Sequence, residues 1–345
     1  MKTAIVLFNL GGPDGPEAVE PFLRNLFSDP AILRVPGFIR PWLASLIARR
    51  RAPVARAVYA KLGGGSPLLA NTQAQARALE AALADRGEVR CFVAMRYWHP
   101  LAAEAARAVK AFAPDRILLL PLYPQFSTTT TASSLADWRR AAAAVGLSAS
   151  TATICCYPTE PGFIASVARL TAEALAEARK LGRAKVLFSA HGLPKRIVEA
   201  GDPYAEQVGE SVGAVVGRLG LAAEDYAVCF QSRVGPLEWL GPYTDEEIAR
   251  TAEEGRPIVL VPIAFVSEHS ETLVELDIDY RHLAAAKGAP AYLRVATVGT
   301  APEFIAGLAD LVRHALDRGR PVSSDRGSRR CAAGRTCCQS EEKAA

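Results

Sequence analysis

The chain has 345 residues, of which 50% are hydrophobic and 22% charged, a composition typical of a soluble globular protein of about two domains. Its net charge of +4, without a lysine-rich run, gives no reason to expect nucleic acid as a partner. No apolar run reaches the ~18 residues that a membrane-spanning helix needs.

The first residues, MKTAIVLFNLGGP, enter an apolar segment at once and show no charged n-region followed by a cleavage site. We therefore expect no secretory signal and a cytoplasmic protein. In that reducing compartment, clustering among the seven cysteines indicates metal binding rather than disulfides.

Short apolar runs alternate with longer amphipathic segments along the chain. Strands are predicted at 3–10, 90–95, 115–122, 151–157, 185–190, 226–231, 257–265 and 291–298, and helices at 69–85, 101–113, 161–180, 203–219, 243–254 and 302–318. Near-continuous apolar strands separated by helices predict α/β structure with parallel sheets covered on both faces. We expect two doubly wound domains, at residues 1–150 and 151–320, and a polar tail at 321–345.

Polar, aromatic, glycine and proline residues gather where the predicted strands end. Examples are NLGGP, MRYWHP and PLYPQFSTTTT in the first half, and SAHGLP, FQSRVGP and VSEHSETL in the second. In open α/β sheets, ligands bind beyond the carboxyl ends of the strands. The simplest interpretation is one cleft between the two domains, lined from both sides.

His191 directly follows the predicted strand 185–190 and precedes Gly192. A lone histidine in such a loop can simply bind a backbone carbonyl. A neutral imidazole is also a metal ligand and a base near pH 7, and the position at a strand end favours that functional reading.

An acidic stretch follows the apolar strand 257–265. A helix with an acidic first turn explains Glu268, because carboxylates are favourable at helix N-termini. It does not explain Glu271, Glu275 and Asp279, whose spacing by four drifts by about 40° per step on an α-helix. A π-type turn, which is wider, brings them closer to one line. This pattern predicts a path for a cation or for protons.

The C-terminal tail holds three cysteines within CAAGRTCC, namely Cys331, Cys337 and Cys338. They are either incidental thiols in a polar tail or, with a fourth ligand, a site for zinc or a [2Fe–2S] cluster. Cys155 and Cys156, at the end of strand 151–157, are the available fourth ligands. The other two cysteines, Cys91 and Cys229, look like buried strand residues.

Taken in chain order, these motifs resemble the ferrochelatase family. They are LFNLGGP at 7–13, YAKLGGGSPL at 59–68, RYWHP at 96–100, PLYPQFSTTTT at 121–131, SAHGLP at 189–194, FQSRVGP with EWLGP at 230–242, and PIAFVSEHSETLVELDIDY at 262–280. The resemblance runs from residue 3 to about 320. It implies two Rossmann-like domains of the chelatase fold with a porphyrin cleft between them. It also implies a lyase that inserts Fe²⁺ into protoporphyrin IX, releases two protons and gives protohaem, the terminal step of haem biosynthesis.

The resemblance assigns the family's histidine to His191 and its glutamate to Glu271, facing one another across the macrocycle. Our hypothesis makes His191 the base for the pyrrole protons and a metal ligand, with Glu271 as its partner. The family's acidic helix then covers the groups that deliver metal or drain protons, namely Glu268, His269, Glu275 and Asp279.

Other matched positions imply contacts with the porphyrin. The ring contacts are expected from Arg96, Tyr97, Tyr123, Ser127, Gln231, Ser232, Trp239 and Phe265, and the contacts near the propionates from Arg51 and Ser66. A guanidinium such as that of Arg51 can form paired hydrogen bonds with a carboxylate. Residues 31–51 match the apolar lip of the pocket. They fit a plain core helix and a peripheral contact with the inner membrane equally well.

The chain also departs from parts of the family. Animal members with a [2Fe–2S] cluster take one ligand from the loop where this chain has Thr128. Some bacterial members use a cysteine near Cys155 or Cys156 with three in the tail, so the resemblance implies the ligands Cys156 (or Cys155), Cys331, Cys337 and Cys338. Coproporphyrin ferrochelatase, cobaltochelatase and a non-catalytic haem- or metal-binding protein are the alternatives, and the oligomeric state is not predicted.

Overall fold

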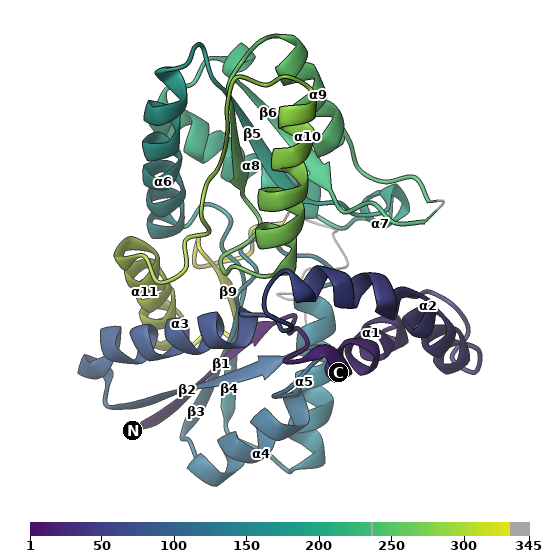
Figure 1. The fold of residues 1–345 in the computed structure, drawn as a ribbon. Coiled ribbons are helices and arrows are strands. Elements are labelled where there is room, and N and C mark those ends of the chain that lie inside the picture. Colours follow the sequence, from purple (N-terminus) through teal and green to yellow (C-terminus); the bar gives the residue numbers. More distant parts are fainter. Residues whose placement is uncertain (236, 332–345) are drawn as a thin grey trace. The chain divides into compact units, whose positions relative to one another are not determined.

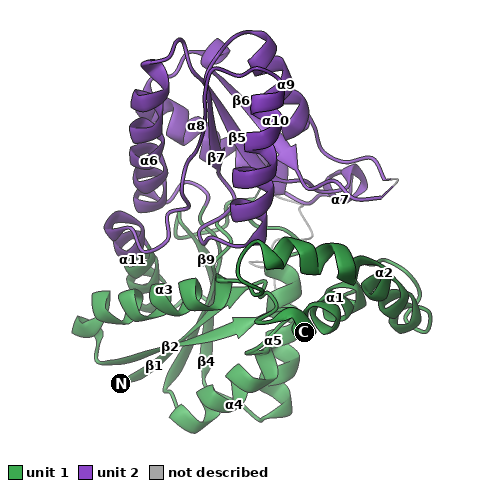
Figure 2. Ribbon diagram, in the orientation of Figure 1, with its two compact units in different colours: residues 1–157, 308–345 green, residues 158–307 purple. Residues whose placement is uncertain are grey.

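The computed structural model describes residues 1–235 and 237–331, which form two compact α/β units (Figure 1). Unit 1 holds Met1–Tyr157 and the described residues from Leu308 onward, and unit 2 holds Pro158–Gly307 (Figure 2). This division differs from the predicted one, in which residues 321–345 form a separate tail. Strand β9 (Val322–Ser324) returns to unit 1 because it pairs in parallel with β4 (Ser150–Cys156).

The sheet of unit 1 has the strand order β2-β1-β3-β4-β9, and its neighbouring strands pair in parallel. Helix α3 packs on one face and helices α4 and α5 on the other (Figure 1). The further elements of this unit are β1 (Lys2–Asn9), β2 (Glu88–Met95), β3 (Arg116–Pro121), α1 (Val19–Ser28), α2 (Arg40–Ala60), α3 (Leu68–Ala82), α4 (Ala102–Phe112), α5 (Thr131–Ala144), the 3₁₀ turns Pro16–Ala18 and Ala84–Arg86, and α11 (Pro302–Arg318), which begins in unit 2.

The sheet of unit 2 has the order β6-β5-β7-β8 and is again parallel. Its four strands are β5 (Lys185–His191), β6 (Tyr226–Gln231), β7 (Ile258–Pro262) and β8 (Tyr292–Arg294). The helices are α6 (Pro161–Arg179), α7 (Lys195–Glu199), α8 (Tyr204–Leu219), α9 (Thr244–Glu253), α10 (Tyr280–Ala286), a 3₁₀ turn at Ala223–Asp225, and a π-helix, η4, at Glu271–Asp279.

Both cores follow from the apolar runs of the sequence. Strand β1 is buried from Thr3 to Asn9, and its alternate side chains Ala4, Val6 and Phe8 pack with Trp138 of α5. In unit 2, Leu187 and Leu260 of neighbouring strands form the corresponding core with Ile248 of α9. The predicted parallel α/β architecture is therefore confirmed. Strand β9 was not predicted, because its sequence VSS is short and polar.

No helix in the described ranges is both long enough and apolar enough to cross a membrane.

Candidate active site

His191 is the last residue of β5, the strand that lies between β6 and β7 in the sheet of unit 2. The turn after it is tight, since the backbone N–H of Gly192 donates to the Gln231 carbonyl of β6 at 2.9 Å. A Cβ at position 192 would lie 3.0 Å from that oxygen and 3.2 Å from the Trp239 ring. Because residue 192 is a glycine, the backbone can pass close to Gln231 and Trp239 as it leaves the sheet, directly after His191 at the strand end.

The acidic stretch forms a π-helix, as its spacing by four predicts. The helix begins at Glu271 and ends at Asp279, so Glu271, Glu275 and Asp279 all lie on its wider turns. Its residues Thr272, Val274 and Leu276 are buried in unit 2. Glu271 and Glu275 are partly buried, and Asp279 is exposed.

His191 and Glu271 are in direct contact. The Nδ1 of His191 lies 3.1 Å from the Oε2 of Glu271, and the Nε2 of His269 lies 3.9 Å from the same oxygen. The side chains of His191 and Glu271 remain 38% and 30% exposed, so a ligand can reach both. The expectation that they face one another across the macrocycle is wrong, because a flat ring does not fit between two atoms 3.1 Å apart.

The contact changes how both groups bind protons. Burial disfavours the charge on Glu271, but the charge and hydrogen bond of His191, with help from His269, hold the pKa of Glu271 well below its usual range. Burial would likewise lower the pKa of His191, yet the carboxylates of Glu271 and Glu275 raise it. His191 therefore stays protonated to higher pH, and Glu271 stays ionised to lower pH, than either would without the other.

Glu275 lies one turn further and behaves differently. Burial and the negative charge of Glu271 raise the pKa of Glu275. The backbone N–H of Ser232 donates to its Oε1 at 3.1 Å, the Ser232 hydroxyl donates to Oε2, and the Tyr280 hydroxyl donates to Oε1 at 3.1 Å. Ser232 adopts a positive φ of 62°, a conformation uncommon outside glycine, and thereby directs both of its donors to one carboxylate.

The remaining acidic residues do not all join this group. The Oε1 of Glu268 accepts hydrogen bonds from the Arg294 guanidinium at 2.8 Å and from the Thr297 backbone N–H at 2.9 Å. Arg294 also lies 3.3 Å from Asp277. Glu268 is thus the ion-pair partner of a buried arginine, and sequence spacing does not reveal this pairing. Asp279 is the last residue of the π-helix.

Four further residues predicted to contact the porphyrin belong to unit 2. Trp239 packs edge-on to His191 at 6.5 Å between ring centroids, and Phe265 lies 4.7 Å from the ring of His269. Gln231 is buried beside His191, where its Oε1 accepts a hydrogen bond from Ser189. The fourth is Ser232, whose hydroxyl donates a hydrogen bond to Glu275. Sequence reasoning missed Tyr204, a buried tyrosine that hydrogen-bonds the His191 backbone and whose pKa is raised by burial and by Glu271.

Unit 1 contains the other predicted contact residues. Arg96 binds Asp29 and Ser133, and Tyr97 is only 1% exposed within a core of that unit, so Tyr97 has a packing role here. Tyr123 and Ser127 are buried after β3. The Ser66 hydroxyl accepts from the Leu68 backbone N–H, and the exposed Arg51 lies over the ring of Phe27 at 5.8 Å.

The predicted cysteine ligands are described only in part. Cys155 and Cys156 end β4 with their sulfur atoms 3.3 Å apart, and Cys331 lies in the last described segment. Cys337 and Cys338 lie outside the described residues. Within residues 1–235 and 237–331 no group of three or more histidine, cysteine or acidic side chains is arranged to hold a metal ion.

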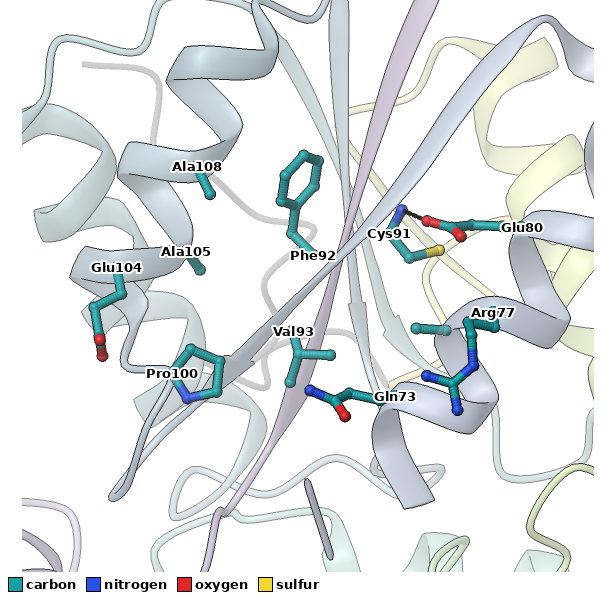
Figure 3. Close-up of a pocket in the computed structure, with 11 residues that line it drawn as sticks. Gln73, Arg77, Glu80, Cys91, Phe92, Val93, Pro100, Glu104, Ala105 and Ala108 are labelled. Atoms are coloured by element: carbon teal, nitrogen blue, oxygen red, sulfur yellow. Dashed lines mark hydrogen bonds between the residues drawn. The ribbon is translucent and has the colours of Figure 1, made fainter. Parts of the chain in front are cut away.

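A pocket of about 590 Å³ lies elsewhere in unit 1, beside the edge strand β2 (Figure 3). It contains no histidine and no predicted site residue. Its two carboxylates already accept backbone N–H groups, Glu80 from Cys91 at 2.6 Å and Glu104 from Leu101 at 2.7 Å. We therefore place the candidate active site at His191 and Glu271 and not in this pocket.

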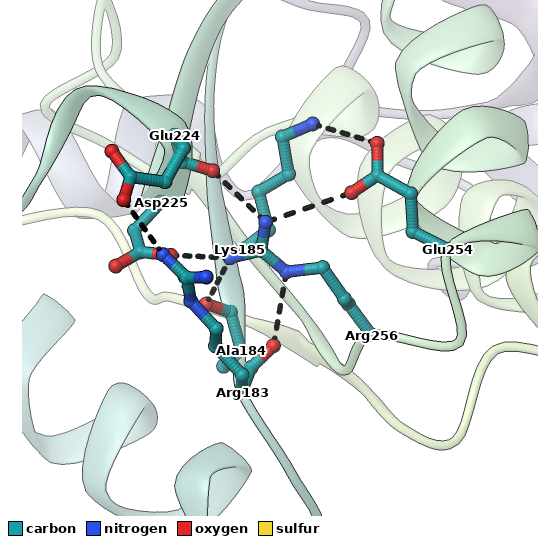
Figure 4. Close-up of polar contacts among 7 residues, drawn as sticks. All are labelled: Arg183, Ala184, Lys185, Glu224, Asp225, Glu254 and Arg256. Atoms are coloured by element: carbon teal, nitrogen blue, oxygen red, sulfur yellow. Dashed lines mark hydrogen bonds and ion pairs between the residues drawn. The ribbon is translucent and has the colours of Figure 1, made fainter.

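A second polar cluster ties together the amino ends of β5, β6 and β7 (Figure 4). Arg256 donates to the carbonyls of Arg183, Ala184 and Glu224 and to the carboxylate of Asp225. Lys185 pairs with Glu254 at 3.3 Å. Cations and anions balance here, and the cluster lies at the end of the strands opposite to His191. Its role is to hold three strands in place.

Comparison with known proteins decides the family. The ferrochelatase family model matches residues 2–316 of the chain. The chain belongs to the ferrochelatase family. A ferrochelatase from Caulobacter vibrioides is 54% identical over 346 residues, covering 99% of each chain, and one from Phenylobacterium zucineum is 56% identical over 321 residues, covering 92% of each. As a ferrochelatase, the chain is an enzyme of haem biosynthesis that inserts a metal ion into a porphyrin.

Solved structures agree on the fold. The protein described as SirB from Bacillus subtilis with Fe³⁺ matches with a TM-score of 0.52 at 14% identity, covering 93% of this chain and 99% of that one. A sirohydrochlorin chelatase SirB in complex with cobalt matches with a TM-score of 0.51. At this identity the likeness shows the chelatase fold alone, and the ferrochelatase sequence relatives carry the function.

Proposed function

We propose that this ferrochelatase uses protoporphyrin IX and Fe²⁺ as substrates and releases protohaem and two protons, as a protoporphyrin ferrochelatase of the lyase class. The observation that carries the proposal is the contact of an imidazole with a carboxylate at 3.1 Å beside a second carboxylate of raised pKa. Metal insertion breaks two pyrrole N–H bonds, so the enzyme needs a proton acceptor next to a cation ligand.

The roles within the site follow from its electrostatics. His191, as the free base, accepts the two pyrrole protons one after the other and passes each on before it takes the next. The adjacent anion Glu271 stabilises the imidazolium that forms each time. Glu275 has a raised pKa and is the next acceptor along the π-helix, so the proton moves on toward solvent there. His191 and Glu271 then offer a nitrogen and an oxygen to Fe²⁺ from the same face of the ring, while the pyrrole nitrogens replace its water ligands.

The choice of porphyrin is tested by insertion assays with protoporphyrin IX and coproporphyrin III side by side, under anaerobic conditions, with Fe²⁺, Zn²⁺ and Co²⁺. We expect kcat/KM to be highest for protoporphyrin with Fe²⁺. Coproporphyrin carries four propionates instead of two. It therefore needs more cationic or hydrogen-bonding partners than Arg51 and Ser66, the two predicted propionate contacts, provide. Preference for coproporphyrin would assign the alternative ferrochelatase, and faster insertion of Co²⁺ than of Fe²⁺ would assign a cobaltochelatase.

We also propose a [2Fe–2S] cluster held by Cys156 (or Cys155), Cys331, Cys337 and Cys338. Two observations support it. The buried thiols of Cys155 and Cys156 lie together at the end of β4. The chain beyond β9 is held against that strand, since the Asp325 backbone N–H donates to the Cys156 carbonyl at 3.2 Å and the buried Arg330 pairs with Asp325. When bound, a cluster supplies positive iron that offsets the thiolates; the chain's part is to bury and orient them.

For the cluster, Cys331→Ser is expected to lose iron, acid-labile sulfide and the visible thiolate-to-iron absorption of the anaerobically purified protein. Cys91→Ser is the matched control, because Cys91 lies on β2, away from β4 and the tail, and should leave all three signals unchanged. A colourless, sulfide-free wild-type protein would rule the cluster out.

Residues 31–51 support a further proposal, peripheral contact with an anionic membrane surface. Phe38 and Trp42 are 86% and 68% exposed, and Arg49, Arg50 and Arg51 follow on helix α2. Exposed aromatic side chains beside a basic cluster suit the boundary between headgroups and acyl chains. Co-flotation with anionic vesicles, weakened by Trp42→Ser and absent with neutral vesicles, is the expected result; equal behaviour of both vesicle types contradicts it.

A further inference from the structure

Asp29, at the end of helix α1, is a buried carboxylate that the proposed chemistry does not use. It is 4% exposed, and its Oδ2 accepts hydrogen bonds from the Arg96 guanidinium at 2.8 Å, from the Tyr97 hydroxyl at 2.9 Å and from the Ser133 hydroxyl. Its Oδ1 accepts the backbone N–H of Ala31 at 2.8 Å. One side chain thus joins the end of β2, helix α5 and the segment that follows α1.

The Arg96 end of this contact is also held on several sides. The Nε donates to Ser133 at 2.7 Å, the Nη1 lies 3.5 Å from Asp137, and the guanidinium lies over the ring of Tyr97 at 5.0 Å from its centroid. The arginine side chain is only 13% exposed. Burying such a pair is costly unless its hydrogen bonds are met, so the arrangement holds Arg96 in one orientation.

The other end of the contact starts the apolar segment of residues 30–39. The backbone N–H of Asp29 donates to the Leu26 carbonyl and ends α1, and the carbonyl of Asp29 accepts from Ile32 at 3.1 Å and from Leu33 at 2.8 Å. Arg40 then binds the carbonyls of Leu33 and Val35. With Ala31 bound to its side chain, Asp29 determines how the chain turns from α1 toward the exposed Phe38 and Trp42.

We propose that Asp29 is a positioning residue for the porphyrin substrate, which aligns Arg96 with the apolar segment of residues 30–39 without touching the ring. The inference rests on the proposed function, because that function makes Arg96 and residues 31–51 contacts of the porphyrin. Removal of the negative charge of Asp29 frees Arg96 from its strongest partner. It also weakens the attachment of residues 30–39 to Arg96 through Asp29. Binding of the porphyrin suffers, whereas the proton transfer at His191 and Glu271 keeps its geometry.

The test compares Asp29→Asn with Asp137→Asn in the full-length enzyme. The asparagine keeps the size and the acceptor for Ala31. It removes the charge and replaces the oxygen that accepts from Arg96, Tyr97 and Ser133 with an NH2 donor. We expect Asp29→Asn to raise KM for the porphyrin about tenfold, which corresponds to ~1.4 kcal/mol, with kcat and the KM for Fe²⁺ within about twofold of the wild type. Asp137→Asn should shift KM less, because Asp137 lies 3.5 Å from Arg96 and binds nothing in residues 30–39.

The results separate a failure of the positioning role from a failure of the proposed function. An unchanged porphyrin KM, or a fall in kcat alone, overturns the positioning role while the proposed function stands. Binding of the porphyrin to the wild-type enzyme is measured by the fluorescence of the porphyrin. If no affinity is measurable, the proposed function itself is overturned. Should Asp29→Asn fail to fold, Tyr97→Phe decides instead: it removes one donor to Asp29, and a rise of about threefold in KM is expected, against no change if the inference is wrong.

Discussion

His191→Ala should lower kcat for metal insertion by about 10²–10⁴-fold, the range that a positioned acid–base group contributes. The imidazole is the proposed acceptor of the pyrrole protons and a proposed ligand of the metal, so its loss removes two functions at once. The fold should survive, because His191 ends its strand at the surface of unit 2 and is 38% exposed. Initial rates with Zn²⁺ and Fe²⁺, and a thermal unfolding curve, measure the two effects.

His282→Ala is the matched control for this substitution. His282 is an exposed histidine on α10 of the same unit. Its replacement should leave kcat and the unfolding temperature unchanged. Near-normal turnover of His191→Ala, with the fold intact, would remove the proposed base and leave Glu271 as the group to examine.

Glu271→Gln should cost more activity than Glu275→Gln. Glu271 touches His191 directly, whereas Glu275 is bound by Ser232 and Tyr280 and acts on His191 through its charge alone. We expect a fall of about 10²-fold or more in kcat for Glu271→Gln, and a smaller one for Glu275→Gln. The opposite order would show that the second carboxylate, not the first, performs the reaction.

The pH dependence of Glu271→Gln gives an independent signature. Glu271 raises the pKa of His191, and the free base of His191 is the active form, so in the wild type the acidic limb of kcat/KM falls at a raised pH. Without the negative charge the pKa of His191 drops, and the limb should move to lower pH. An acidic limb that stays in place would mean that His191 is not the base that sets it.

Part of the site could be predicted from the sequence because its signals are local. The spacing by four of Glu271, Glu275 and Asp279 is a property of one segment, and it led to the π-helix that the structure contains. His191 follows an apolar run directly, and in a parallel sheet the carboxyl ends of strands gather at one edge. Such patterns depend on residues only a few positions apart.

Other parts depended on which elements become neighbours. Glu268 pairs with Arg294, 26 positions away, and Asp29 binds Arg96 and Ser133, 67 and 104 positions away. The sequence contains each of these charges but not their partners. The direct contact of His191 with Glu271 is of the same kind, since 80 positions separate them. The expectation that they face one another across the macrocycle was therefore wrong although both residues had been identified.

The sequence by itself determined the parallel α/β architecture, the strand ends that carry polar motifs and the membership in the ferrochelatase family. Periodicity and motif order depend only on the order of residues in the sequence, and the burial of apolar strands between helices follows from them. Only the tertiary structure decided that strand β9 returns to unit 1, that Tyr204 supports His191, and which carboxylates are paired and which remain available. Those facts depend on the packing of distant segments, where desolvation and Coulomb energy select the partner of each charge.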